Sequence, residues 1–212
     1  MPLNELPLIQ EADLKDKVVL VRVDHNVVKS GVIHDPYRID ATFGTLFYIL
    51  SKGGKIILMT HVGRPRNKKD GSITQSDETS VRPIVEYLEN KLHLSIEVPE
   101  FYTHGSEGYL SIESNINHSI RRLRNHDIDM IYLPNTRWFA GEEAKDDNYE
   151  RFTNQLAGLA DIYVNDMVSV LQNLKPALKK DAILALMIGD TIIHGNYIPC
   201  TKRILEKAAK DY

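Results

Sequence analysis

The hydrophobic pattern of the chain alternates between short continuous apolar runs and longer segments with a helical period. The run over 18–23 is rich in β-branched residues, and a cluster of polar residues follows each of four such apolar runs. Continuous apolar runs of this length are typical of strands that are buried on both faces of a sheet. With their clusters, the runs are V-L-V-R-V-D-H-N (19–26), I-I-L-M-T-H-V-G-R-P (56–65), M-I-Y-L-P-N-T-R (130–137) and D-I-Y-V-N-D (161–166).

The segments between these runs follow the 3.6-residue period of amphipathic helices. In 38–51, for example, Ile39, Phe43, Leu46 and Leu50 lie on one helical face, and Gly53 follows as a typical helix end. The polar segment 63–79 is predicted to be a mobile loop. The pattern predicts helices over 38–51, 81–92, 113–124 and 148–160, and strands over 18–23, 55–60, 96–98, 129–133 and 161–164.

Strands that alternate with helices favour parallel βαβ units with right-handed crossovers. We therefore predict an α/β protein: a Rossmann-like, three-layer α/β/α fold with a mostly parallel sheet in a single domain. The alternation weakens after Asp166. We expect one domain over 1–166 and a divergent C-terminal extension over 167–212 that packs on the same domain. Within the extension, 167–180 is amphipathic, 182–188 could form a strand, and 201–210 could form a charged helix.

Composition excludes several classes of function. A net charge of -3 gives no electrostatic basis for binding nucleic acid. No stretch approaches the ~18 apolar residues of a membrane span, and the N-terminus lacks the features of a secretory signal. Cys200, the only cysteine, fits a reducing compartment, so we expect a cytoplasmic protein without disulfides. The histidines show no metal-ligand spacing and no phosphate-binding nucleotide loop is visible, so no metal or cofactor is expected in this chain.

The polar clusters carry the candidate chemistry. Because the carboxyl ends of parallel strands meet at one edge of a sheet, we expect these clusters to lie together there. Two arginines and a histidine at one edge suggest an anionic substrate, most simply a phosphate or a carboxylate. The edge would carry Asp24, Asn26, His61, Arg64, Asn135, Arg137, Asn165 and Asp166.

Each candidate also has a purely structural interpretation. Asp24 and Asn26 alternate around His25 and could hold hydroxyl groups of a ligand, or could cap backbone N–H groups. His61 and Arg64 could bind an anion on a tight loop, or could simply be solvated. Arg38 lies at a predicted helix start, where a cation gains little unless an anion is nearby, although it could be a surface arginine.

In their order along the chain, these motifs resemble the N-terminal, substrate-binding domain of phosphoglycerate kinase. The segments V-R-V-D-H-N, M-T-H-V-G-R-P, L-P-N-T-R-W-F and A-D-I-Y-V-N-D, with Arg38, resemble the family patterns R-V-D-F-N, S-H-L-G-R-P, E-N-T-R-F and Y-V-N-D-A-F-G-T-A-H-R. The likeness covers roughly residues 10–166.

The resemblance implies a role for each residue. Asp24 and Asn26 would hold the hydroxyl and carboxylate end of 3-phosphoglycerate. His61, Arg64 and Arg137 would grip its phosphate. Arg38 would be the catalytic residue that stabilises the transferring phosphoryl group, because this chemistry depends mainly on positioning and charge neutralisation.

The chain also departs from the family. Met167-Val168-Ser169-Val170-Leu171 stands where the family has A-F-G-T-A, and the histidine and arginine that follow in the family are missing. The family also uses Mg-ADP or Mg-ATP on a second domain, and some 46 residues follow Asp166 here. We therefore expect no kinase activity from this chain alone, and activity only if another chain supplies a nucleotide-binding half. The alternatives are a non-catalytic relative that senses anions or binds proteins, and a remnant with little function.

Overall fold

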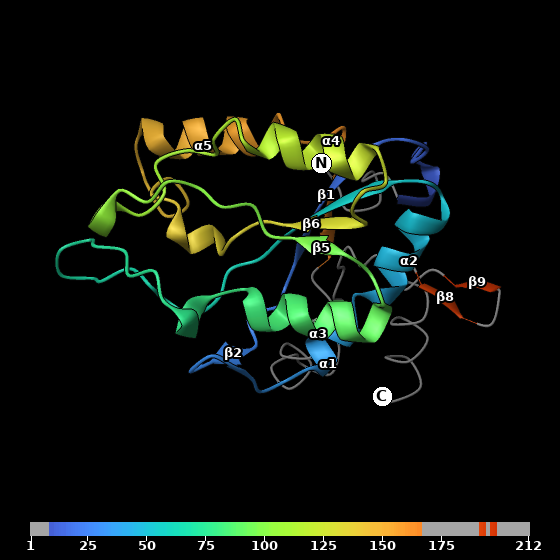
Figure 1. Cartoon of the computed structure of the whole chain (residues 1–212), viewed down its shortest axis with the longest axis horizontal. Coiled ribbons are helices and arrows are strands. Elements are labelled where there is room, and N and C mark those ends of the chain that lie inside the picture. Colours follow the sequence, from blue (N-terminus) through green and yellow to red (C-terminus); the bar gives the residue numbers. More distant parts are fainter. Residues whose placement is uncertain (1–8, 167–190, 194–195, 199–212) are drawn as a thin grey trace, which may run out of the picture.

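A single parallel sheet forms the centre of the computed structural model, which describes residues 9–166, 191–193 and 196–198. Its five strands are ordered β5-β6-β4-β1-β7, and every neighbouring pair is parallel (Figure 1). The predicted α/β class and parallel sheet are confirmed. The strands are β1 (Val18–Val23), β4 (Lys55–Met59), β5 (Ile96–Glu97), β6 (Met130–Tyr132) and β7 (Ile162–Asp166).

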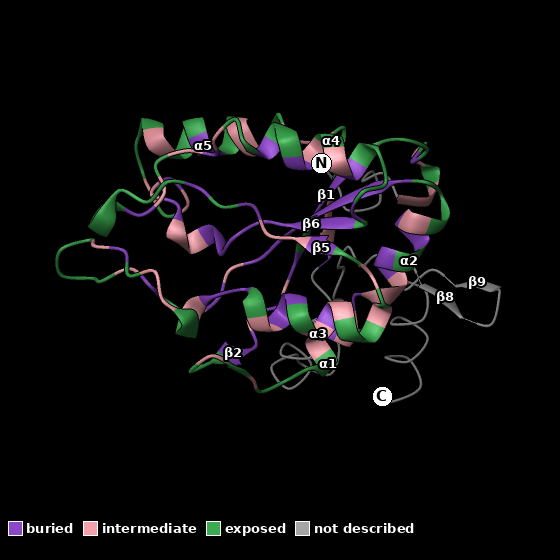
Figure 2. Cartoon of the chain, in the orientation of Figure 1, coloured by how far each residue is buried: buried purple, intermediate pink, exposed green. Residues whose placement is uncertain are grey.

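Helices cover both faces of this sheet, and two separate apolar cores result. On one face, Val19 and Val21 pack with Leu46 of α2 (Phe43–Ser51) and Leu88 of α3 (Arg82–Leu92). On the other face, Leu20 of the same strand packs in a core with residues of α4 (Ile116–Arg124) and α5 (Asp147–Ala157) (Figure 1). Alternate residues of a buried strand therefore serve opposite cores, and Figure 2 shows the central strands largely buried, with Arg22 of β1 as the exposed exception in β1 and β4. This arrangement is the predicted three-layer fold.

Local signals explain where the helices begin and end. The side chain of Asp146 caps α5 by accepting a hydrogen bond from the backbone N–H of Asn148 at 3.0 Å. α3 has Pro83 in its first turn and ends at His93, which adopts a left-handed conformation (φ 54°). Gly54 follows α2 where a Cβ atom would come within 2.6 Å of the Ile49 side chain, so a larger residue would force the helix away from the sheet.

The predicted helix 38–51 is divided in two, which corrects the sequence interpretation. α1 (Tyr37–Asp40) is separated from α2 at Thr42. The Thr42 N–H bonds to the Ile39 carbonyl three residues back (3.0 Å), and the Thr42 hydroxyl donates to the same carbonyl (2.8 Å). Competition by a threonine side chain for a helical carbonyl is a known cause of a local break. Arg38 therefore lies in a four-residue helix, and an argument from the dipole of a long helix does not apply to it.

A second correction concerns the end of β7. The sequence predicts Asn165 and Asp166 just past this strand, but they belong to it and pair in register with Arg22 and Val23 of β1. β7 is longer than predicted because β1 offers it hydrogen-bonding partners up to Val23. Asp166 is buried at this strand end (2% exposed).

The remaining described elements are short. β2 (Val28–Lys29) and β3 (Val32–Ile33) form a small antiparallel hairpin beside α1. The segment 63–79 is irregular as predicted, apart from an isolated bridge between Arg66 and Ile73 and the 3₁₀ turn η3. The 3₁₀ turns are η2 (Ile9–Glu11), η3 (Asp77–Thr79), η4 (Gly105–Glu107) and η5 (Thr136–Trp138).

Beyond β7, the structure describes only an antiparallel pair. β8 (Thr191–Ile193) pairs with β9 (Asn196–Ile198). The elements predicted over 167–180, 182–188 and 201–210 lie outside the described residues. Among the helices that are described, none combines the length and the apolar character needed to cross a membrane.

Candidate functional site

The loops that follow β1, β4 and β6 meet at the carboxyl edge of the sheet and enclose a small cavity. The cavity measures about 290 Å³, near the lower end of the ~300–1,000 Å³ range of small-molecule pockets. A cavity of this size suits a small ligand. Its lining residues are Asn26, Val28, Lys29, His61, Gly63, Arg64 and Arg137.

Arg38 is tied to the β1 side of this edge. Its guanidinium forms an ion pair with Asp24, and Nη1 donates to the backbone carbonyl of Asn26 at 3.0 Å. The side chains of Asp24 and Arg38 are 22% and 21% exposed, so the pair is partly shielded from water. Because an anionic ligand competes for the same charge as Asp24, this contact can be exchanged when a ligand binds.

Asn26 joins the β1 loop to the loop after β4 and fixes the protonation of His61. The amide oxygen of Asn26 accepts from the backbone N–H of Gly63 at 2.9 Å, so its NH₂ group faces His61. The Nε2 atom of His61 lies 3.3 Å from this NH₂ group and must therefore accept from it. His61 is thus neutral with its proton on Nδ1, in agreement with a pKa that burial and the nearby Arg137 guanidinium hold below the ordinary value of 6.5.

Arg137 lies on the β6 side of the cavity. Its guanidinium donates through Nη1 to the carbonyl of Gly63, and its Nε atom lies 3.7 Å from a carboxylate oxygen of Glu143. Its backbone N–H is bound by the side chain of Asn135 (3.1 Å). The guanidinium is therefore held by a backbone carbonyl that a ligand does not replace.

Two further cations border the cavity with free side chains. Arg64 and Lys29 are exposed and make no hydrogen bond or ion pair within the part of the chain that the structure describes. Their charges are available to an incoming anion. The sequence interpretation missed Lys29. This residue lies in β2, and without knowledge of the β2–β3 hairpin nothing in the sequence indicates that it borders the cavity.

His25, the neighbour of Asn26, faces the protein interior. It is fully buried between Tyr132, whose hydroxyl lies 3.0 Å from Nδ1, and Thr42, whose hydroxyl lies 3.2 Å from Nε2. The Thr42 hydroxyl uses its proton on Ile39, so it accepts from Nε2–H, and Nδ1 accepts from Tyr132. Burial lowers the pKa of His25 to about 3 and keeps it neutral. His25 is a structural residue, as the alternation of a strand end predicts.

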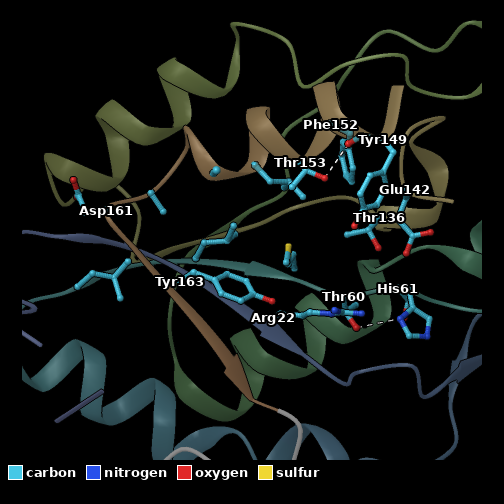
Figure 3. A pocket seen from close by; sticks show the side chains of 16 residues that line it. Arg22, Thr60, His61, Thr136, Glu142, Tyr149, Phe152, Thr153, Asp161 and Tyr163 are labelled. Atoms are coloured by element: carbon cyan, nitrogen blue, oxygen red, sulfur yellow. Dashed lines mark hydrogen bonds between the residues drawn. The ribbon is translucent and has the colours of Figure 1, made fainter. Parts of the chain in front are cut away.

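A larger cavity of about 580 Å³ opens beside His61, between α5 and the sheet (Figure 3). Its walls are largely apolar, with Met59 from β4 and Phe152 from α5, and Arg22, Thr60 and Glu142 lie near its polar end. Burial raises the pKa of the Glu142 carboxyl, although Arg137 opposes this shift. Apolar walls do not suit a small, highly charged ligand, so the smaller cavity is the better candidate for an anion site. Arg22, an exposed cation within an otherwise buried strand, is a signal that the sequence interpretation passed over.

The structure therefore brings the six predicted site residues together in one connected group. Asn26, His61, Arg64 and Arg137 line the small cavity, and Asp24 and Arg38 are joined to it through Asn26. Asn135 and Asp166 are buried and do not line the cavity. Within the described ranges, no group of three or more histidine, cysteine, aspartate or glutamate side chains could hold a metal ion.

Comparison with known proteins identifies relatives of this architecture. A family model for phosphoglycerate kinase matches residues 9–182. The chain is 37% identical over 167 residues to a phosphoglycerate kinase from Lactobacillus gasseri, covering 75% of this chain and 37% of the relative. It is 32% identical over 167 residues to one from Wolbachia sp. subsp. Brugia malayi, covering 77% and 36%.

The solved structure of the phosphoglycerate kinase from Pyrococcus horikoshii OT3 shares the fold. It matches with a TM-score of 0.57 at 22% identity, over 76% of this chain and 36% of that one. The 212 residues thus span little more than a third of the length of the relatives they match.

Proposed function

The chain belongs to the phosphoglycerate kinase family, and we propose that its small edge cavity binds 3-phosphoglycerate or a similar phosphorylated acid. One observation carries this proposal. Side chains from three separate loops, namely Asn26, His61 with Arg64, and Arg137, line one cavity of about 290 Å³. A small ligand with a carboxylate and a phosphate would find both charge complementarity and hydrogen-bond donors there.

In the proposed complex, His61, Arg64 and Arg137 contact the phosphate. Arg137 and Arg64 supply permanent charges, and His61, which donates through Nδ1–H when neutral, gains a second N–H and a positive charge when it takes up a proton. Asp24 and Asn26 contact the hydroxyl and carboxylate end of the ligand. The exposed Lys29 adds positive charge on the hairpin side of the cavity.

Arg38 is the proposed catalytic residue. In the structure its guanidinium is bound to Asp24 and to the carbonyl of Asn26. An arginine that leaves a carboxylate can neutralise charge on the equatorial oxygens of a phosphoryl group in transfer. Such a role affects the rate of the reaction more than the binding of the ground state.

We propose phosphoryl transfer between 1,3-bisphosphoglycerate and ADP only in combination with a nucleotide-binding half that binds Mg-ADP or Mg-ATP, supplied by another chain. The matched relatives extend well beyond the region that this chain covers. The alternative function is a non-catalytic relative that senses phosphorylated acids. The resting Arg38–Asp24 ion pair favours this alternative, because the proposed catalytic arginine is engaged by the chain itself.

Isothermal titration calorimetry with 3-phosphoglycerate and, separately, with Mg-ATP tests the proposal. We expect saturable 1:1 binding of 3-phosphoglycerate and no binding of Mg-ATP to the 212-residue chain. A folded chain that binds neither compound would refute the proposed function. A coupled assay in which the pure chain turns over both substrates would refute the requirement for a second half.

A further inference from the structure

We propose that Asn135 is a positioning residue of the anion site. The buried amide of Asn135 fixes Arg137 relative to the His61–Arg64 loop without touching the ligand. This inference rests on the proposed function. Asn135 is 0% exposed and does not line the small cavity. Any effect that it has on a ligand is therefore exerted through its neighbours.

The amide of Asn135 uses its full hydrogen-bonding capacity. Its oxygen accepts from the backbone N–H groups of Val62 (3.0 Å) and Arg137 (3.1 Å). Its nitrogen donates to the backbone carbonyls of Val62 (2.7 Å) and Thr79 (2.8 Å). An asparagine side chain offers two acceptor sites and two donors, and all four are occupied here.

These bonds tie together three segments that are distant in the sequence. Val62 lies between His61 and Gly63 in the loop after β4, and Thr79 lies just before α3. Arg137 belongs to η5, which begins directly after Asn135. The binding groups thus stand on an irregular loop and on a three-residue 3₁₀ turn, and a rigid polar group is needed to fix their separation.

Neighbouring contacts strengthen the same junction, among them the bond from Arg137 Nη1 to the carbonyl of Gly63, but none of them satisfies the backbone groups that Asn135 holds. The N–H of Thr136 donates to the carbonyl of Thr60 at 3.0 Å, and the indole N–H of Trp138 donates to the hydroxyl of Thr79 at 3.0 Å. Neither contact involves the backbone of Val62 or the backbone N–H of Arg137. Without the Asn135 amide, these groups would lose their partners inside the protein, and the loop could move away from Arg137.

The test uses Asn135→Leu, a neutral substitution of similar size that removes all four bonds. We expect calorimetry to give an affinity for 3-phosphoglycerate at least tenfold lower than in the wild type. We also expect the pKa of His61, followed by NMR of its ring, to rise toward 6.5, because burial in the packed loop and the nearby Arg137 both lower it in the wild type. A merely structural role would not move this pKa in a protein that remains folded.

Leu123→Ala is the matched control, because it truncates a fully buried side chain on α4, outside the edge loops. It should lower the free energy of unfolding and leave both the affinity and the pKa of His61 unchanged. If Asn135→Leu does not fold, Asn135→Ala takes its place, since it leaves room for water to satisfy the freed backbone groups.

The possible outcomes separate this inference from the proposed function. The positioning role would be overturned if a folded Asn135 variant bound 3-phosphoglycerate with the wild-type affinity and kept the wild-type pKa of His61. Absence of wild-type binding would instead overturn the proposed function, and the pKa of His61 would still decide whether Asn135 holds the His61 loop packed against Arg137.

Discussion

Two histidines close to the same sheet edge occupy regions of opposite character. The inner region contains His25 with Tyr132 and Thr42, and the edge region contains His61 with Asn26 and Arg137. Both imidazoles are neutral, but His25 carries its proton on Nε2 and His61 carries it on Nδ1. The partners of His25 are buried and fixed, whereas the Nε2 atom of His61 faces an amide that borders a cavity.

This difference separates stability from binding. A histidine whose two ring nitrogens are satisfied inside the core contributes to folding and cannot respond to a ligand. A histidine whose lowered pKa depends partly on Arg137 can be protonated when an anion neutralises that arginine. Residue type alone does not distinguish these two kinds of histidine. The hydrogen-bond partners of the ring nitrogens do.

The largest expected effect on binding comes from Arg137→Ala. Loss of a charge-assisted contact costs ~1.5–3 kcal/mol, so the affinity for 3-phosphoglycerate should fall by roughly a factor of ten to a hundred. Calorimetry measures the change, and Arg151→Ala, on the exposed side of α5, is the control that should leave affinity unchanged. An Arg137→Ala variant that binds as tightly as the wild type would show that the edge region is not the binding site.

The second prediction concerns the inner region and acid stability. Below pH 6.5 the unfolded chain protonates His25, but the folded chain does not until about pH 3. The stability gained from neutral His25 is therefore present above pH 6.5 and is lost as the pH falls. The wild type should lose about 2 kcal/mol of unfolding free energy from this group between pH 7 and pH 5.

His25→Phe tests this prediction by removing the titrating group. The variant has lost the bonds to Tyr132 and Thr42, so it should be less stable at pH 7, but its stability should decline less steeply toward pH 5. Urea unfolding at both pH values measures the slopes. Equal slopes in wild type and variant would show that His25 is not the buried neutral group described here, and ligand affinity at pH 7 should be unchanged in either case.

How far the sequence could predict these regions depends on the kind of contact. The sheet, its parallel strands and the convergence of Asn26, His61 and Arg137 follow from apolar runs and from the geometry of parallel strands. The break between α1 and α2 at Thr42 could not be predicted, because it depends on which backbone carbonyl accepts a hydrogen bond from the Thr42 hydroxyl. The junction made by Asn135 was also hidden, since its partners Val62 and Thr79 lie 73 and 56 residues away in the sequence.

The third prediction is a pH dependence of anion binding through His61. Because a bound anion favours protonated His61, affinity should rise as the pH falls toward the lowered pKa of the free protein, by less than tenfold per pH unit. Sulfate is the suitable probe, since its own charge does not change in this range. In the His61→Asn variant, the affinity for sulfate should depend less on pH. If the affinity still changed with pH as in the wild type, a titrating group other than His61 would be responsible.

The smallest expected effect on binding is that of Arg38→Ala. Since Arg38 is bound to Asp24 in the free chain, its removal should weaken the binding of 3-phosphoglycerate less than fivefold, well below the effect of Arg137→Ala. Turnover with an added nucleotide-binding half should fall far more. If Arg38→Ala lowered the affinity as much as Arg137→Ala does, Arg38 would not be an exchangeable arginine that differs in role from the fixed Arg137.

A crystal structure of the chain soaked with 3-phosphoglycerate would show whether the edge residues form one anion site. We expect the phosphate between His61, Arg64 and Arg137, with the carboxylate end toward Asn26 and the Arg38 side chain released from Asp24. A ligand bound elsewhere, with the small cavity still empty and the Arg38–Asp24 pair intact, would contradict this expectation.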